Sequence, residues 1–191
     1  MINLLKSLPY LENDIIQDWF NAPNYYPWLN NIAKNFHPKN ILEIGVRLGY
    51  SAIAFTHGTT AETYTGIDFE ENYGSLEKAV ANINFSKDHP FEVITYNRNT
   101  QELALNFLSK YDFIHIDGDH SKQGALNDIL NFWSVLEVGG HMLIDDSIYA
   151  PPVFGNRDVY EAIQEAIKKL GTPTPPNYNI MTYRGTWVIC K

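Results

Sequence analysis

The sequence has one cysteine, Cys190, among its 191 residues, and this excludes an internal disulfide and fits a reducing compartment. It has no apolar run of about 18 residues, which a membrane-spanning helix would need. The N-terminus lacks the basic start and the small-residue cleavage site of a signal peptide. We therefore expect a cytoplasmic domain with no membrane association.

Basic residues are also few. Fourteen Lys and Arg face 22 Asp and Glu, for a formal charge of −8. This balance excludes a sequence-independent nucleic-acid binder, which needs a basic face. Hydrophobic residues make up 45% of the chain, enough for the core of one domain of this length.

The stretch Asn40 to Ser51 organises the rest of the chain. A short apolar run leads into a turn with glycines at 45 and 49, and a helix is expected from Ser51 to His57. Such a strand, turn and helix directs backbone N–H groups and the positive end of a helix dipole at a ligand. Because glycine has no Cβ, the ligand can approach the main chain closely, so a nucleotide-like ligand is expected.

The spacing of the turn decides between nucleotides. The dinucleotide pattern is G-x-G-x-x-G, whereas this turn reads E-x-G-x-x-x-G-x-S and lacks the third glycine. The acid Glu43 would repel a pyrophosphate but suits an ammonium or a sulfonium. The pattern resembles motif I of the class I S-adenosylmethionine (SAM) dependent methyltransferases. That resemblance implies that Glu43, Gly45, Gly49 and Ser51 line the SAM site; the alternative is a strand-turn-helix corner that binds nothing.

A second acid follows at the end of the next expected strand, Thr63 to Phe69. Asp68 lies 23 residues after Gly45, close to the spacing of about 20 at which an acid meets ribose hydroxyls in nucleotide-binding folds. Similar methyltransferases use this acid for the ribose of SAM. The other interpretation is a turn or capping residue before the helix expected at 75–85.

The next strand is expected at 91–96. Asn99 then has the spacing of a helix start, and we expect the helix to run to Lys110. Residues after this strand flank the adenine ring in the family, but the sequence here does not single one out. The adenine contact is therefore left unassigned.

Aspartates follow two further strands. The apolar run from Tyr111 ends in Asp-Gly-Asp-His-Ser at 117–121, and the run from Gly139 ends in Asp145 and Asp146. Neighbouring parallel strands lie about 4.8 Å apart, and ligands bind at their carboxyl ends. Two carboxylates about 4 Å apart repel by roughly 4 kcal/mol at an effective dielectric of 20. A divalent cation would remove that cost.

The pairing of D-G-D-H-S with G-G-x-x-x-x-D-D resembles the small metal-dependent O-methyltransferases, in particular the branch with macrolide-sugar methyltransferases and cephalosporin-hydroxylase-like proteins. The resemblance covers 40–191. It implies that Asp117, Asp145 and Asp146 bind Mg²⁺ and that His120 takes the proton from a hydroxyl of a small-molecule substrate. The short N-terminal region and the lack of a long insertion leave the substrate open.

The alternation of strands and helices predicts a Rossmann-like, doubly wound α/β domain at 40–191, with helices on both faces of a mostly parallel sheet. A closing hairpin of strands at 178–183 and 186–190 makes one edge antiparallel. Residues 1–39 form a helical, aromatic segment packed on this core, with a helix expected at 27–36. Its aromatics, including Trp19 and Phe20, are core residues, cover a substrate pocket or pair two subunits in a homo-oligomer.

Three other functions stay open. One is a methyltransferase without a metal, in which the aspartates contact SAM and His120 caps a helix or lines a pocket. Another is a SAM-binding domain without catalytic activity, because fold does not fix function. A metallophosphoesterase is the least supported, since the further His and Asn ligands it needs at strand ends are not found.

Overall fold

The structure is a computed structural model that describes residues 1–12, 24–69, 75–103, 109–147, 149–150, 153–154, 156–172 and 185–191. These residues form two compact units, Met1–Arg98 and Asn99–Lys191. Each unit contains three strands of a six-stranded sheet. Among the described residues, no helix is long and apolar enough to cross a membrane.

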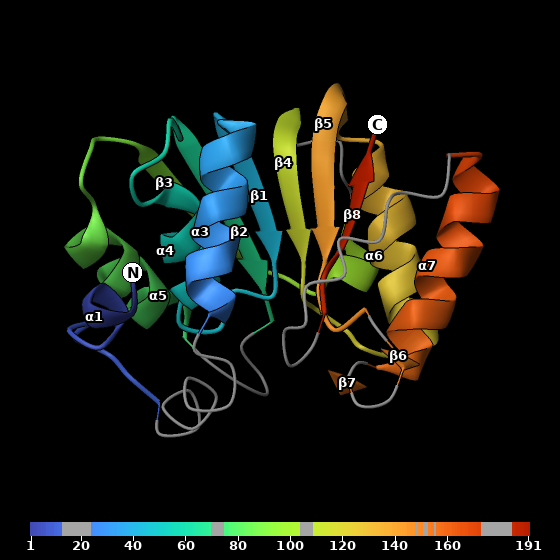
Figure 1. Cartoon of the computed structure of the whole chain (residues 1–191), viewed down its shortest axis with the longest axis horizontal. Coiled ribbons are helices and arrows are strands. Elements are labelled where there is room, and N and C mark those ends of the chain that lie inside the picture. Colours follow the sequence, from blue (N-terminus) through green and yellow to red (C-terminus); the bar gives the residue numbers. More distant parts are fainter. Residues whose placement is uncertain are drawn as a thin grey trace. The chain divides into compact units, whose positions relative to one another are not determined.

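Three parallel strands form the sheet of the first unit (Figure 1). They are β1 (Asn40–Ile44), β2 (Thr63–Asp68) and β3 (Glu92–Asn97), with β2 in the middle. Almost all residues of β1 and β2 are buried, polar ones included, as expected for parallel strands covered by helices. Glu43 pairs with Gly66 in the register of β1 and β2, so the carboxyl ends of these strands meet at one edge.

Helices α4 (Tyr50–Thr56) and α5 (Leu76–Ser86) connect these strands. Ser75 begins α5, since its side chain accepts a hydrogen bond from the backbone N–H of Lys78. Each of these two helices forms the crossover between two parallel strands. They match the helices predicted at 51–57 and 75–85 to within one residue at each end.

The N-terminal segment contributes α1 (Ile2–Leu5) and α3 (Tyr25–Phe36). The latter starts two residues before its predicted start, because Pro27 is tolerated in the first turn, where its missing N–H has no partner to lose. Helix α3 lies beside α4, in front of the strands in Figure 1. Trp19 and Phe20, which the sequence places in an aromatic cluster, lie outside the described residues.

The sheet of the second unit is mixed. Its strands are β4 (Tyr111–Ile116), β5 (Leu136–Ile144) and β8 (Trp187–Cys190). Strand β5 pairs parallel with β4 and antiparallel with β8, which confirms the predicted antiparallel C-terminal strand. The predicted partner strand at 178–183 lies outside the described residues. A small separate ladder joins β6 (Tyr149–Ala150) and β7 (Val153–Phe154).

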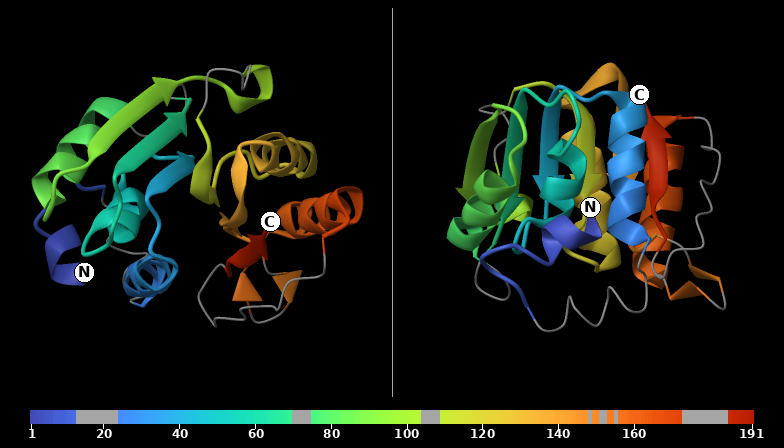
Figure 2. Two further views of the ribbon diagram at one scale, coloured as in Figure 1. Left: turned by 90° about the horizontal axis from the view of Figure 1, so that it is seen from above. Right: turned by 60° about the vertical axis from the view of Figure 1, so that its left-hand side comes forward.

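Two amphipathic helices, α6 (Lys122–Trp133) and α7 (Arg157–Leu170), lie side by side in this unit (Figure 2). Each begins at a side-chain cap: Ser121 accepts from the N–H of Gly124, and Asn156 from that of Asp158. Helix α7 ends at Gly171, whose φ of 66° is a left-handed conformation that glycine adopts at low cost.

The predicted helix from Asn99 to Lys110 is wrong at its start. Asn99 caps only one 3-10 turn, η1 (Thr100–Glu102), after which Leu103 is extended. The side chain of Gln101 bonds to Asp128 and Asn127 of α6. We infer that these tertiary bonds outweigh the local helix signal.

Candidate functional site

The turn after β1 has the backbone conformation that its glycines predict. Gly45 and Gly49 have φ of 86° and 79°, which residues with a Cβ rarely adopt. A Cβ on Gly49 would also lie 3.2 Å from Ile83. Between them Arg47 has φ of 52° although it is not a glycine. The turn is therefore closely packed and locally strained.

Glu43 lies beneath this turn and is fully buried. Its Oε2 accepts a hydrogen bond of 2.5 Å from the Tyr64 hydroxyl. Burial, followed by the neighbouring Glu43 carboxylate, raises the pKa of Tyr64 well above its ordinary value, so the phenol remains a donor at neutral pH. Tyr64 therefore holds the carboxylate of Glu43 in place. The sequence predicts a role for Glu43 but does not identify Tyr64 as its partner.

Asp68, at the end of β2, holds the turn in place. Its Oδ2 accepts hydrogen bonds from the backbone N–H groups of Val46 and Arg47, at 2.8 and 2.6 Å. Its Oδ1 accepts one from Phe69 at 2.7 Å. A carboxylate has about four acceptor positions, so three bonds leave room for a ribose hydroxyl. The interpretation of Asp68 as a turn residue thus has structural support, and its predicted role as a ribose ligand is compatible with it.

Ser51 is half-buried in the first turn of α4. With Glu43, Gly45, Gly49 and Asp68, it belongs to one continuous arrangement formed by the ends of β1 and β2 and the turn between β1 and α4. The residues predicted for SAM are therefore gathered within the first unit. Their contact with SAM remains a prediction.

In the second unit, three of the predicted side chains converge at the carboxyl ends of β4 and β5. His120 Nε2 lies 3.1 Å from Asp117 Oδ1 and 3.5 Å from Asp146 Oδ2. One ligand atom from each of these residues lies within 4.8 Å of the others. Asp146 adopts φ of 52°, an unusual conformation for a residue other than glycine. Such conformations are frequent at functional sites.

The cluster is strongly acidic. The hydrogen bond from His120 to Asp117 raises the pKa of His120 to about 9; burial opposes this, and the charges of Asp117, Asp146 and Asp145 add to it. The protonated imidazole therefore balances part of the carboxylate charge. The half-buried Asp117 and the nearly buried Asp146 offer carboxylate oxygens suited to a divalent cation, and His120 lies beside both. The residues of this cluster therefore fit a divalent cation.

Asp145 differs from the other predicted ligands. It is buried, and its Oδ1 accepts a hydrogen bond of 2.8 Å from the Thr186 hydroxyl. Its carboxylate is not in the cluster of Asp117, His120 and Asp146. Thr186 thereby orients the Asp145 carboxylate, as an outer-shell partner orients a metal ligand. No local pattern singles out Thr186, which lies 41 residues from Asp145 along the chain.

Asp119, between Asp117 and His120, has a structural role. Its Oδ1 accepts from the N–H of Ser121 at 2.8 Å. Its side chain fills the space where Gly124 would carry a Cβ, with Oδ2 only 2.1 Å from that position. Asp119 and Gly124 therefore position the loop that carries His120.

Comparisons with known proteins identify the family of the chain. A family model described as a methyltransferase domain matches residues 42–147. The O-methyltransferase hkm8 of Aspergillus hancockii is 28% identical over 131 residues, which are 67% of this chain and 50% of that protein. The chain thus spans half the length of this relative.

Solved structures have the same fold. The S-adenosylhomocysteine (SAH) bound Podospora anserina methyltransferase PaMTH1 superposes with a TM-score of 0.62 and 17% identity, covering 99% of this chain and 92% of that one. The O-methyltransferase from Bacillus cereus in complex with SAH superposes with a TM-score of 0.62 and 19% identity, covering 100% of this chain and 87% of that one. The fold is therefore the mostly parallel, Rossmann-like α/β fold predicted from the sequence. Because the family model matches more than half of the chain, this protein belongs to the methyltransferase domain family.

Proposed function

We propose that this chain is a SAM-dependent O-methyltransferase that methylates a hydroxyl of a small molecule, such as a sugar or another natural product, with the help of Mg²⁺. The observation that carries the proposal is the convergence of Asp117, His120 and Asp146 at the ends of β4 and β5. Membership of the methyltransferase family and likeness to an O-methyltransferase support it.

In this proposal the first unit holds the cofactor. The turn between Gly45 and Gly49 accommodates the methionine half of SAM, with Glu43 beneath it and Ser51 in the following helix, and Asp68 accepts from the ribose hydroxyls. SAM supplies an electrophilic methyl group on its sulfonium. The protein then has to position the acceptor oxygen and increase its nucleophilicity.

The second unit prepares that oxygen. Asp117, Asp145 and Asp146 would hold Mg²⁺, which lowers the pKa of a hydroxyl when bound. His120 accepts the hydroxyl proton at Nε2, the atom that faces Asp117 and Asp146. The new C–O bond forms as the C–S bond breaks, and SAH leaves. A bound cation would oppose the acidic field that raises the pKa of His120, and would so leave the imidazole free to accept a proton.

The test is methyl transfer from isotopically labelled SAM to a panel of hydroxylated sugars and phenols, with protein stripped by EDTA and resupplied with Mg²⁺. We expect transfer only with the cation, and a loss of roughly 10²- to 10⁴-fold in His120→Ala. Asp146→Asn should lose the response to Mg²⁺, whereas the control Asp158→Asn, an exposed acid of α7, should keep it. Full activity in EDTA would leave a metal-independent methyltransferase; SAH binding without transfer to any acceptor would favour a non-catalytic SAM-binding domain.

A further inference from the structure

The turn proposed to hold SAM is tied to a part of the chain that the sequence does not connect with it. Residues 10–12, which we name the N-terminal strap, follow α1 and are attached to the turn in two ways. One attachment runs through Tyr10 and the buried Asn82, and the other runs through Glu12. All of these residues lie in the first unit.

The first attachment is made by the amide of Asn82 in α5. Its Oδ1 accepts from the N–H of Tyr10 at 3.0 Å, and its Nδ2 donates to the carbonyl of Tyr10 at 2.9 Å. The same Nδ2 donates to the carbonyl of Leu48 in the turn at 3.0 Å. Because Asn82 is fully buried, water competes little for the groups that form these hydrogen bonds. One amide thus joins the strap to the turn.

The second attachment is made by Glu12. Its backbone N–H donates to the hydroxyl of Tyr50 at 3.1 Å, and Tyr50 is the residue that begins α4 directly after the turn. Its carboxylate lies 2.6 Å from Nε of Arg47. The side chain of Arg47 is 36% exposed and that of Glu12 is 28% exposed. Solvent therefore screens this ion pair less than it screens a fully exposed pair.

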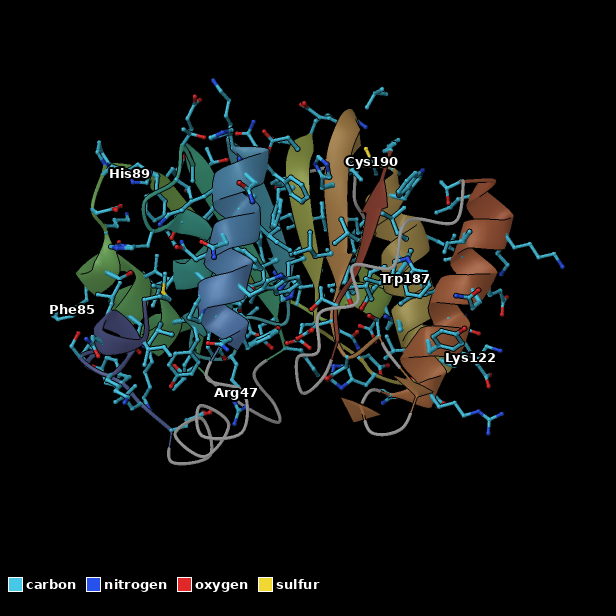
Figure 3. The ribbon with its side chains drawn as sticks, viewed as in Figure 1. Arg47, Phe85, His89, Lys122, Trp187 and Cys190 are labelled. Atoms are coloured by element: carbon cyan, nitrogen blue, oxygen red, sulfur yellow. The ribbon has the colours of Figure 1, made fainter. Side chains whose placement is uncertain are left out.

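Arg47 is the strained residue of the turn, with φ of 52°. It lies beyond the carboxyl end of β1 (Figure 3). Its N–H donates to Asp68, the proposed ribose ligand, while its side chain pairs with Glu12. Strained backbone persists only where surrounding contacts hold it. The ion pair with Glu12 therefore restrains Arg47, and the backbone conformation of Arg47 sets both the shape of the turn and its hydrogen bond to Asp68.

We propose that Glu12 and Arg47 are positioning residues for the cofactor: their ion pair latches the N-terminal strap to the turn and holds the turn in the form that binds SAM. This inference rests on the proposed function, because it assigns a role in SAM binding. Neither residue is required to touch SAM. The strap preorganises the turn before SAM binds, so that less of the binding free energy is spent on ordering the turn.

The experiment measures SAH binding by calorimetry in the full chain. Glu12→Gln keeps the size of the side chain and removes its charge, and we expect the dissociation constant to rise roughly three- to fivefold, as for the loss of a partly screened ion pair. Arg47→Ala should give a similar loss, the double variant no more than either one, and Arg47→Lys should keep most of the affinity. Glu62→Gln is the matched control, because it removes another ion pair of the same unit, Lys39–Glu62, at 2.8 Å.

Hydrogen exchange gives a second readout that does not need the ligand. The amides of Val46 and Arg47 should exchange faster in Glu12→Gln than in the parent or the control. If the parent binds SAH and Glu12→Gln binds equally tightly, the latch is wrong and the proposed function stands. A loss in Arg47→Ala alone would show a direct contact with the ligand instead, and would also overturn it. A parent that does not bind SAH would refute the proposed cofactor site itself, and the inference with it.

Discussion

Asp128 in α6 is predicted to make the stability of this protein fall as the pH rises from about 4 to about 6. The side chain is fully buried. Its Oδ1 accepts from Gln101 at 3.0 Å, while Oδ2 has no hydrogen-bond partner. Burial raises the pKa of Asp128 from 3.8 to about 6; the nearby Asp119 adds to this, and bonds from Thr100 and Gln101 oppose it.

The sign follows from proton binding. Between pH 4 and pH 6 the folded chain binds more protons at this carboxyl than the unfolded chain, so the free energy of unfolding falls with rising pH. A pKa difference of one corresponds to about 1.4 kcal/mol, and the full effect is therefore about 3 kcal/mol at most. Above pH 6 the protein carries the whole cost of a buried charge.

The assay is urea denaturation of the parent and Asp128→Asn at several pH values between 4 and 7.5. The amide cannot ionise, so the stability of Asp128→Asn relative to the parent should increase by about 2 to 3 kcal/mol across this range. An unpaired amide N–H in the variant would lower its free energy of unfolding by the same amount at every pH. Comparing how the free energy of unfolding changes with pH in the two proteins therefore removes this constant term. A difference between the two proteins that does not change with pH would refute the reasoning.

Two further predictions concern residues next to the acidic cluster. Gly124→Ala should lower the free energy of unfolding by roughly 1 to 3 kcal/mol, although alanine favours helices, because the new Cβ would lie 2.1 Å from Oδ2 of Asp119; a variant as stable as the parent in urea would contradict this. Thr186→Val removes the hydroxyl that donates to the buried Asp145 and should cost about 1 to 3 kcal/mol, with weaker Mg²⁺ binding by calorimetry. Unchanged Mg²⁺ affinity would place Asp145 outside the metal site.

Local signals in the sequence predicted the elements that carry the two groups of site residues. The apolar runs, the glycines at 45 and 49 and the capping residue Ser75 each act over a few neighbouring residues, so a single sequence is enough to recognise them. Because parallel strands end at the same edge of a sheet, the approach of Asp117 to Asp146 also followed from the order of the strands.

Long-range contacts could not be read in this way. In the described part of the helix expected from Asn99, residues 99–103, only one 3-10 turn forms, and Gln101 in that turn is bonded to side chains 26 and 27 residues away. The bonds of Asp145 to Thr186 and of Glu12 to Arg47 join residues with no common motif. In each case the local pattern fitted more than one conformation, and packing in the folded chain selects between them.

The measurement that tests the central claim most directly is a calorimetric titration of SAH into the parent chain and into Asp68→Ala. The account predicts micromolar binding by the parent, about 8 kcal/mol. The variant should bind at least tenfold more weakly, since Asp68 both accepts from the turn and is proposed to accept from the ribose. A parent that does not bind SAH, or an Asp68→Ala variant that binds as tightly as the parent, would contradict the account.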